Sequence, residues 1–499
     1  MQFVSHPLIK KDAIEEREYQ LNILNTAVKN NTLCVLPTGL GKTPIAILLA
    51  VDRLTKFPEK KILMMSPTRP LCAQHEKSFK NILTIDEELI SLVTGIIRPD
   101  DRRVIYKNSR IIIATPQTIE NDLKNYVIDL NDFSLLVFDE CHRAVKDYAY
   151  TYVADRYKEI PNHLILGLTA SPGSSEEKIK QICKNLGIKS VEIRTEIDED
   201  VSEFVKDIKL EYVKLNLPDD MRYAQENLKI ALRFRLERLK EYSIHVNRKS
   251  ELLQAQKKIS NRIHTEKKPI LYYLASLTAE TIKIWHALEL LETQSIKSLK
   301  IYFDKLRDNK IKSNVRVLND KNVKNAIMYF EKPGLEHPKI EKLREIIKKE
   351  IGENKNVSII IFSHYRDNID KIHENLEPVC RPVILIGQRG EKGLTQKEQI
   401  DVIKDFNAGY YNCLITSPIG EEGLHIPSAD IAIFYDSVPS EIRTIQRRGR
   451  VGRTKVGKII FLLTKKTRDE SNFYASMYKE RRMKTILRQL QSQKKLTGF

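Results

Sequence analysis

The sequence is short of several features that would place it in particular protein classes. Its 499 residues include only six cysteines, and no two of them form a Cys-x-x-Cys pair. The cysteines are scattered along the chain, at Cys34, Cys72, Cys141, Cys183, Cys380 and Cys413. This pattern excludes a disulfide or zinc framework and indicates thiols in a reducing compartment. No apolar run reaches membrane-spanning length, and the N-terminus lacks a signal peptide's apolar core. We therefore expect a soluble, intracellular protein.

Acidic residues are too few to balance the basic ones. The chain has 84 Lys+Arg against 66 Asp+Glu, which gives a formal net charge of +18. Such an excess is typical of proteins that bind a polyanion, and nucleic acid is the first candidate. A basic protein without such a partner is the alternative. The length is too great for one core, and roughly three domains are expected.

The most specific pattern is Leu36–Thr43, with the sequence LPTGLGKT. It lies between the apolar runs Leu33–Leu36 and Ile45–Ala50. A strand, a glycine-rich turn and a helix therefore follow one another, as a phosphate-binding loop requires. The strict form of that loop has glycine at the position of Leu36, so the match is to the shorter Thr-Gly-x-Gly-Lys-Thr form.

The residue types in this stretch suit a nucleotide with Mg²⁺. Gly39 and Gly41, after Thr38, let backbone N–H groups approach anionic oxygens. The helix that begins near Lys42 adds its positive N-terminal end. Lys42 would reach the terminal phosphates, and the Thr43 hydroxyl would ligate Mg²⁺. The pattern predicts a site for the phosphates of a nucleotide with Mg²⁺.

Short apolar runs alternate with helical patterns over the first 205 residues. The expected strands are Leu33–Leu36, Ile62–Met65, Ile111–Ala114, Leu135–Phe138 and Leu164–Leu168. Runs of this kind, separated by amphipathic helices, favour a parallel sheet covered on both faces. Ligand sites in such sheets lie at the carboxyl ends of the strands.

An acid pair follows one of these strands directly. Asp139 would hold Mg²⁺ through water, and Glu140 would orient and deprotonate the attacking water. An acid pair after a strand can also be a helix cap, but the spacing and the phosphate loop favour the site. Thr169 and Ser171 follow another strand, where small hydroxyl residues could link the nucleotide site to a neighbouring domain; the alternative is a turn.

Three further polar turns follow expected strands and suit a nucleic-acid backbone. Their candidate contacts are Thr68, Arg69, Thr94, Gly95, Thr115 and Gln117. Each turn alone could be ordinary loop chemistry. Upstream, Arg17 and Gln20 lie on an expected helix before the phosphate loop. The Gln20 amide offers a donor and an acceptor to an adenine edge.

Together these residues resemble a superfamily 2 helicase. Motifs Q, I, II and III of that superfamily correspond here, in their usual order, to the Gln20 region, Leu36–Thr43, Asp139–His142 and Thr169–Ser171. Ala114–Leu123 and Leu168–Ser174 are more specific, and resemble the archaeal Hef helicases, relatives of the Fanconi anaemia group M translocase. Cys141 stands where those proteins usually have alanine, a small and neutral change. The resemblance implies that the nucleotide is ATP, bound with Mg²⁺, and that His142, Thr169 and Ser171 couple its hydrolysis to movement.

The strand–helix alternation stops between residues 206 and 335. Long helical patterns, such as Met221–Ser243 and Ile270–Asp308, replace it. By composition, residues 206–332 hold 27 Lys+Arg against 16 Asp+Glu, so this insert carries most of the net charge. The resemblance to Hef implies that the insert grips branched or duplex DNA; the alternative is a basic bundle that only stiffens the link. Trp285 fits a core position better than a base-stacking one.

A second set of strand-like runs lies between residues 336 and 499, without a phosphate loop. It consists of Val357–Phe362, Val383–Ile386, Cys413–Thr416, Ile431–Tyr435 and Lys458–Leu463. Arg450 and Arg453 suit charge that develops on a phosphoryl group, and their surroundings resemble motif VI. The resemblance makes both of them arginine-finger candidates and places Gln446 near the attacking water.

Other motifs of the last third follow from the same resemblance. Residues 416–427 look like motif V, which assigns Gly423 to ATP binding. His425 stands where the family usually has aspartate, and this puts the ribose contact in doubt. Residues 362–366 and 387–388 resemble motif IV and its companion, which implies that they face the DNA strand; the alternative is ordinary loop residues. The candidate DNA contacts of the last third are Ser363, His364, Arg366, Gln388 and, at the start of motif V, Thr416. The basic helical pattern Ser471–Ser492 follows, and no nuclease pattern is present, so we expect no nuclease activity.

The sequence thus predicts an α/β protein with two RecA-like parallel-sheet domains, residues 1–205 and 336–499, and a helical insert domain, residues 206–335. The expected function is that of an ATP-dependent DNA helicase or translocase on forked or branched DNA, in the cytoplasm or at the nucleoid. A partner nuclease or replication-clamp protein is compatible with the resemblance. Two alternatives stay open. One is an ATPase activated by double-stranded RNA, as in RIG-I-like receptors and Dicer. The other is a structure-specific DNA-binding module with a weak motor, at which His425 hints.

Overall fold

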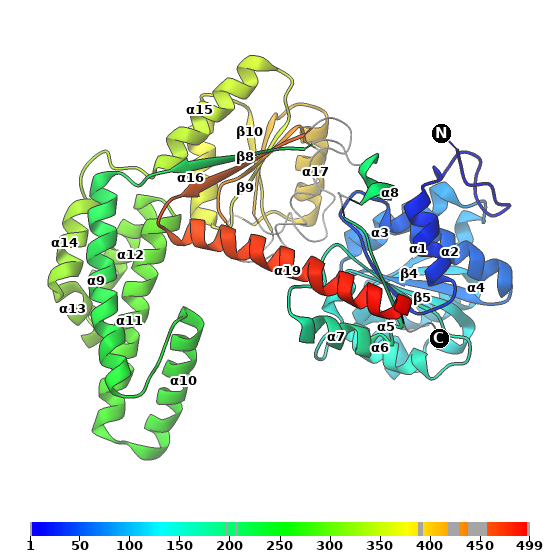
Figure 1. Cartoon of the computed structure of the whole chain (residues 1–499), viewed down its shortest axis with the longest axis horizontal. Helices are drawn as coiled ribbons and strands as arrows, with labels where there is room; N and C mark the ends of the chain where they lie inside the picture. The colour runs from blue at the N-terminus through cyan, green and yellow to red at the C-terminus, as the bar shows by residue number, and fades with distance from the viewer. Residues whose placement is uncertain are drawn as a thin grey trace.

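The computed structural model describes residues 2–195, 198–204, 208–387, 393–417, 429–437 and 457–496. These residues form two parallel β-sheets that are covered by helices and a third unit made of helices alone (Figure 1). The α/β class, the two RecA-like sheets and the helical unit between them in sequence are confirmed.

The first sheet has seven strands in the order β3-β4-β2-β5-β6-β1-β7. Their bounds are β1 Thr32–Val35, β2 Lys61–Met65, β3 Ile90–Val93, β4 Ile111–Ala114, β5 Phe133–Asp139, β6 Ile165–Thr169 and β7 Ser190–Ile193. The central strands are buried along their whole length, which is why they are continuous apolar runs. All pairs are parallel, so the carboxyl ends of the strands meet at one edge.

Helices cover both faces of this sheet. Their bounds are α1 Glu18–Ala27, α2 Lys42–Lys56, α3 Arg69–Ile82, α4 Pro99–Asn108, α5 Pro116–Lys124, α6 Ala149–Lys158, α7 Glu176–Asn185 and the short α8 Glu199–Ser202. Three 3-10 turns, η1 Glu87–Leu89, η2 Leu130–Asp132 and η3 Cys141–Arg143, complete the domain. Two apolar clusters lie one on each side of the sheet. In α2 every residue of Ile45–Val51 is buried, which fixes the helix that follows the phosphate loop.

The second sheet has six parallel strands in the order β10-β11-β9-β12-β13-β8. Their bounds are β8 Ile208–Leu215, β9 Ile359–Phe362, β10 Pro382–Leu385, β11 Cys413–Thr416, β12 Ile431–Phe434 and β13 Gly457–Thr464. The strand β8 corrects the expected start of the insert, because residues 208–215 pair with β13 along their whole length. The chain therefore contributes a strand to the second sheet before it enters the helical unit. Helices α15 Pro338–Glu353, α16 Arg366–Leu376 and α17 Gln396–Asn407 belong to this second domain.

The helical unit consists of α9 Asp219–Glu241, α10 Lys249–Glu266, α11 Pro269–Thr293, α12 Ile296–Asp308, α13 Lys312–Asn319 and α14 Lys321–Phe330. It has its own apolar core, which includes Trp285, so the expectation of a core position for this residue is confirmed. The expected helical stretch Ile270–Asp308 is two helices, because the chain is extended at Gln294 and the Ser295 side chain caps α12.

One long helix, α19 Arg468–Leu496, follows the last strand. Figure 1 shows it running from the junction of the second sheet and the helical unit to the first domain. The sequence predicted this helix but not its path. The expected strands all exist within two residues of their predicted ends. The sequence missed β3, β7 and β8, which lie at sheet edges and contain polar residues among the apolar ones.

Candidate nucleotide site and its surroundings

The loop between β1 and α2 has the geometry of an anion cradle. Gly39 and Gly41 have φ angles of 94° and 75°, which L side chains rarely adopt. A Cβ atom on Gly39 would meet nothing within 4 Å, so the loop is open on that side. The Lys42 ammonium donates to the backbone carbonyls of Leu36 (3.0 Å) and Pro37 (3.4 Å) and so lies over its own loop. Backbone N–H groups, a helix N-terminus and a lysine thus converge, which suits terminal phosphates.

The helix α1 rests directly on this loop. The Tyr19 hydroxyl donates to the Leu40 carbonyl (2.9 Å), and the Gln20 amide donates to the Tyr19 hydroxyl (3.3 Å). A Cβ atom on Gly41 would lie only 2.4 Å from the Gln20 amide nitrogen. Arg17 donates to Glu15 and lies over the ring of Phe204, 4.8 Å from its centroid. The structure therefore places Arg17 and Gln20 beside the loop. Adenine recognition by Gln20 stays a prediction.

Asp139, the last residue of β5, is buried in a polar network. Its carboxylate accepts from the Ser66 hydroxyl at 2.6 Å and lies 2.9 Å from His75 Nε2. The Tyr150 hydroxyl donates to its backbone carbonyl at 2.6 Å. Burial alone would raise the pKa of Asp139, but His75, Ser66 and the charge of Lys42 outweigh burial and lower it. Asp139 is therefore held as a carboxylate.

His75 brings the two expected magnesium ligands together. Its Nε2 contacts Asp139, and its Nδ1 lies 3.5 Å from the Thr43 hydroxyl. A carboxylate and a hydroxyl that converge on one side of the phosphate loop match the oxygen donors that Mg²⁺ takes. The sequence missed His75 and Ser66. Ser66 stands at the carboxyl end of a strand and could have been found from that position, whereas His75 lies inside a helix without a signal.

Glu140 has a left-handed backbone, with φ 49°. This conformation costs a residue with a side chain about 1–3 kcal/mol, and such strain is concentrated at functional sites. Its Oε2 atom lies 3.2 Å from His142 Nδ1. The same nitrogen lies 3.1 Å from the Thr169 hydroxyl oxygen, which accepts from the Ser171 backbone N–H. The four residues Glu140, His142, Thr169 and Ser171 therefore form one continuous chain of contacts.

The candidate DNA contacts that lie in described residues follow the carboxyl ends of parallel strands or begin the next helix. Among them, Arg69, Gly95, Gln117 and Arg366 are exposed. Thr115, Ser363 and Thr416 are buried, and their hydroxyls contact Thr118, Asp436 and the Ser417 carbonyl. Thr68 and His364 are partly buried, and Thr94 is buried. Direct DNA contact stays a prediction for all of them, and it is easiest to reconcile with the exposed residues.

Several predicted residues lie outside the described parts of the chain. They are Gln388, Gly423, His425, Gln446, Arg450 and Arg453. Their roles stay predictions. The six cysteines all lie in described residues, and none of them forms a disulfide. Within the described residues no helix is long and apolar enough to cross a membrane.

Family models account for most of the chain. The model described as "DEAD/DEAH box helicase" matches residues 17–179, and "Helicase conserved C-terminal domain" matches residues 338–455. Residues 222–337 match a model described as "Putative ATP-dependent RNA helicase, helical bundle". A phosphate loop and an Asp-Glu pair on the first of two parallel sheets, with a helical unit inserted between them, define a superfamily 2 helicase.

Individual relatives narrow this class to one family. The crystal structure of the Pyrococcus furiosus Hef helicase domain is 40% identical in sequence, with a TM-score of 0.76; the match covers 94% of this chain and 100% of that one. A Methanocaldococcus jannaschii protein named as a "putative ATP-dependent RNA helicase" is 42% identical over 98% of this chain. The chain belongs to the Hef, FANCM and Mph1 family of ATP-dependent helicases. The predicted resemblance is confirmed.

Two eukaryotic relatives differ in the nucleic acid that their names give. The ATP-dependent DNA helicase mph1 of Neurospora crassa is 32% identical over 91% of this chain. The "DEAD-box ATP-dependent RNA helicase FANCM" of Arabidopsis thaliana is 32% identical over 89%. The chain spans 63% of the Methanocaldococcus protein, 42% of the Neurospora protein and 34% of the Arabidopsis protein.

Proposed function

We propose that this chain is an ATP-driven DNA helicase or translocase that acts on forked or branched DNA, in replication-fork repair and recombination. The observation that carries the choice of substrate is the helical unit, which joins a strongly basic composition to a fold of its own. Residues 219–330 hold 23 Lys+Arg against 13 Asp+Glu. A basic unit beside a two-domain motor can hold the duplex arms of a fork through their phosphates.

The nucleotide would be held by the first domain. Thr38, Gly39 and Gly41 supply backbone N–H groups, and the Lys42 ammonium turns from the loop carbonyls to the terminal phosphates. Thr43 and Asp139 would hold Mg²⁺, which supplies charge neutralisation at the phosphates when bound. Arg17 and Gln20 would contact the base.

Hydrolysis would need a base in the first domain and charge stabilisation from the second. Glu140 orients and deprotonates the attacking water. Gln446, Arg450 and Arg453 would complete the site on closure, with the arginines at the developing phosphoryl charge. Gly423 would contact the nucleotide. His142, Thr169 and Ser171 would pass the state of the site to the second domain.

The bound DNA strand would lie along the edges of both sheets where the β-strands have their carboxyl ends. The proposed contacts are Thr68, Arg69, Thr94, Gly95, Thr115, Gln117, Ser363, His364, Arg366, Gln388 and Thr416. Phosphate contacts bind without sequence preference and weaken steeply with salt.

The test is ATP hydrolysis with forked DNA, linear duplex DNA, single-stranded DNA and duplex RNA, for the wild type and Glu140→Gln. We expect the strongest stimulation with forked DNA and its loss in the variant. Retained nucleotide binding by Glu140→Gln, measured with a fluorescent ATP analogue, would show that the variant is folded. No hydrolysis with any nucleic acid would overturn the assignment as a motor and favour a structure-specific DNA-binding module.

The role of the insert needs a matched pair of variants. Lys257 and Lys258 are exposed on α10, which Figure 1 shows at the end of the helical unit far from the second sheet. Lys348 and Lys349 are also exposed, on α15 in the second domain. Changing both α10 lysines to alanine should weaken fork binding and reduce its salt dependence by up to about two phosphate contacts. The α15 pair should leave both unchanged. Equal effects of the two pairs would contradict a specific grip by the insert.

Double-stranded RNA is the second candidate, because two of the relatives above are named RNA helicases. Stimulation by duplex RNA alone would keep the motor and replace the substrate. Stimulation by forked DNA alone would exclude this candidate.

A further inference from the structure

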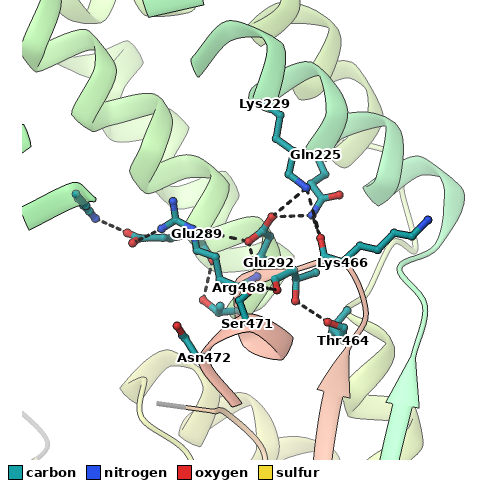
Figure 2. A network of polar contacts seen from close by, with 12 residues as sticks. Gln225, Lys229, Glu289, Glu292, Thr464, Lys466, Arg468, Ser471 and Asn472 are labelled. Atoms are coloured by element: carbon teal, nitrogen blue, oxygen red, sulfur yellow. Dashed lines mark hydrogen bonds and ion pairs between the residues drawn. The ribbon is translucent and has the colours of Figure 1, made fainter. Parts of the chain in front are cut away.

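The helix α19 begins on the helical unit. The Arg468 backbone N–H donates to the Glu292 carboxylate at 2.9 Å, and the Gln225 amide donates to the same carboxylate at 2.6 Å (Figure 2). The Arg468 guanidinium pairs with Glu289 and lies 5.0 Å from the centre of the Trp285 ring. Glu292 is 1% exposed. A buried carboxylate and an aromatic core residue of the insert therefore hold the first turn of α19.

The next residues fix α19 to the second domain. The Asp469 carboxylate accepts from the backbone N–H of Ser437 (2.9 Å) and Thr464 (3.0 Å), and it pairs with Lys339 at 2.7 Å. Both charged side chains of that pair are 1% exposed. One turn later, Phe473 packs in the apolar cluster of the second sheet. This end of α19 is therefore attached both to the second domain and to the insert.

The other half of α19 packs on the first domain. Met483, Ile486 and Leu487 are buried in the cluster that covers one face of the first sheet. Arg488 pairs with Asp198 at 3.0 Å, and Gln491 donates to Glu192 at 3.0 Å. The ion pair between Arg488 and Asp198 is more exposed than the Lys339–Asp469 pair at the other end, so apolar packing holds most of this half of α19 on the first domain.

Met483 contacts Ser171, one of the residues to which the proposed function assigns coupling. The buried Ser171 hydroxyl donates to the Met483 sulfur at 3.0 Å. From Ser171 the contacts run to Thr169, then to His142, and from His142 to the Glu140 carboxylate. An unbroken series of contacts therefore joins the insert, the whole of α19 and the carboxylate expected to activate water.

We propose that α19 is a coupling helix, in which Met483 is a positioning residue that acts on Ser171, and Arg468 is its anchor on the insert. The proposal rests on the proposed function, because it assigns a route by which nucleic acid held by the insert changes ATP hydrolysis. Arg468 and Met483 are 15 residues apart, about 22 Å along a helix. A continuous helix transmits a shift over that distance, because its backbone hydrogen bonds resist stretching.

The decisive variant is Met483→Leu, which keeps the apolar volume and removes the sulfur acceptor. Hydrolysis without nucleic acid should be unchanged. The stimulation ratio, which is the rate of ATP hydrolysis with nucleic acid divided by the rate without it, should fall about fivefold, the lower end of typical coupling effects. Arg468→Gln should lower the same ratio while affinity for the stimulating nucleic acid stays within a factor of two. Tyr478→Ala is the control, because Tyr478 lies on the same helix with a side chain that is 64% exposed.

A double-mutant comparison separates coupling from simple packing. If Met483 acts through Ser171, then Ser171→Ala with Met483→Leu should lower the ratio no further than Ser171→Ala alone. Independent effects that multiply would overturn the proposal. A wild-type stimulation ratio in Met483→Leu or in Arg468→Gln would also overturn it. A Tm within 2 °C of the wild-type value would show that the variant is folded.

The wild type is measured first, with each nucleic acid. If none stimulates, the proposed function fails before α19 is tested. If one does, the variants are compared with that one, so the two failures are distinct.

Discussion

The two parallel sheets are built to the same plan, and their differences show where the chemistry resides. Strands β4, β2, β5 and β6 of the first sheet stand in the same order as β11, β9, β12 and β13 of the second. In each sheet a serine after one central strand donates to an aspartate at the end of its neighbour. Ser66 donates to Asp139 at 2.6 Å, and Ser363 donates to Asp436 at 2.7 Å. The two halves share a serine–aspartate frame.

The surroundings of the two aspartates differ in charge. Burial raises the pKa of Asp436, and the charge of Lys339 and the hydrogen bond from Ser363 do not offset that effect. Around Asp139 the effect of burial is smaller than that of His75, Ser66 and Lys42 together, so its pKa falls. Of the two, Asp139 beside the phosphate loop has the lowered pKa, which is the condition that the proposed cation site needs.

The strands β1 and β8 occupy equivalent positions in the two sheets, but the chain leads from them into different elements. In the first sheet, β1 lies beside β6 and leads into the phosphate loop and α2. In the second, β8 lies beside β13 and leads into α9 and the rest of the helical unit. The insert therefore occupies the place of the phosphate loop. A common frame carries nucleotide chemistry in one half and a basic unit in the other.

The largest expected difference is between Asp139→Asn and Asp436→Asn. Loss of the Asp139 charge should lower ATP hydrolysis by about 10³-fold, because a metal contributes several kcal/mol to the transition state and 1.4 kcal/mol is tenfold. Asp436→Asn should stay within about threefold in the absence of nucleic acid, since Asp436 touches no described residue of the phosphate loop. Steady-state hydrolysis at saturating ATP decides this. Equal losses would mean that the second frame also serves the chemistry.

Glycines in left-handed conformations give the next comparison. Gly41→Ala adds a Cβ atom 2.4 Å from the Gln20 amide, whereas Gly334, with φ 76°, has nothing within 4 Å of such an atom. Both changes should cost about 1–2 kcal/mol of stability from backbone strain. Only Gly41→Ala should also weaken ATP binding, by at least about tenfold, because Gln20 and the loop must move apart. Titration with a fluorescent ATP analogue, beside a Tm measurement, separates the two effects. Unaltered binding by Gly41→Ala would show that the loop tolerates the displacement.

The contrast between the halves also explains how much of the fold the sequence could predict. The strands β4 and β11 have the predicted bounds, because buried parallel strands are uninterrupted apolar runs. The phosphate loop and Asp139 were predictable from local spacing. The strand β8, with sequence IKLEYVKL, alternates polar and apolar residues, so it does not match the pattern of a buried parallel strand.

Long-range contacts were beyond prediction from spacing. His75 reaches Asp139 across 64 residues, and Met483 reaches Ser171 across 312. Nothing near either residue in the sequence marks its partner, since tertiary packing alone brings them together. The path of α19 to the first domain was unpredictable for the same reason.

The serine hydroxyls test the shared frame more finely. Ser66→Ala leaves the Asp139 carboxylate in contact with His75. It should lower the free energy of unfolding by about 1–3 kcal/mol, the usual effect of removing a donor from a buried charge. Ser363→Ala leaves Asp436 with the His364 backbone N–H, at 2.8 Å, and should cost about 1 kcal/mol. Calorimetric Tm values compare the two, and a larger loss for Ser363→Ala would reverse the ranking of the two frames.

The smallest expected effect concerns His337, the cap of α15 where the insert meets the second domain. Burial and the charge of Lys339 lower the pKa of His337 to about 3, from an ordinary value near 6.5. Below pH 6.5 the unfolded chain binds a proton at this residue and the folded chain does not, so stability falls as the pH falls, by up to about 1.4 kcal/mol per unit. In the first domain, the N-caps of α1, α2 and α3 are Arg17, Gly41 and Thr68, which do not titrate in this range.

His337→Asn should remove this dependence and keep the cap, because asparagine can accept the Lys339 N–H that the His337 Nδ1 now accepts at 3.4 Å. Between pH 7 and 5.5 the Tm of the variant should therefore fall about 2–4 °C less than that of the wild type. The reason is that a neutral amide takes up no proton in either state, so the folded and unfolded chains stay balanced over this range. Parallel pH profiles for the two proteins would show that His337 is not held neutral, and that the junction with the insert admits water.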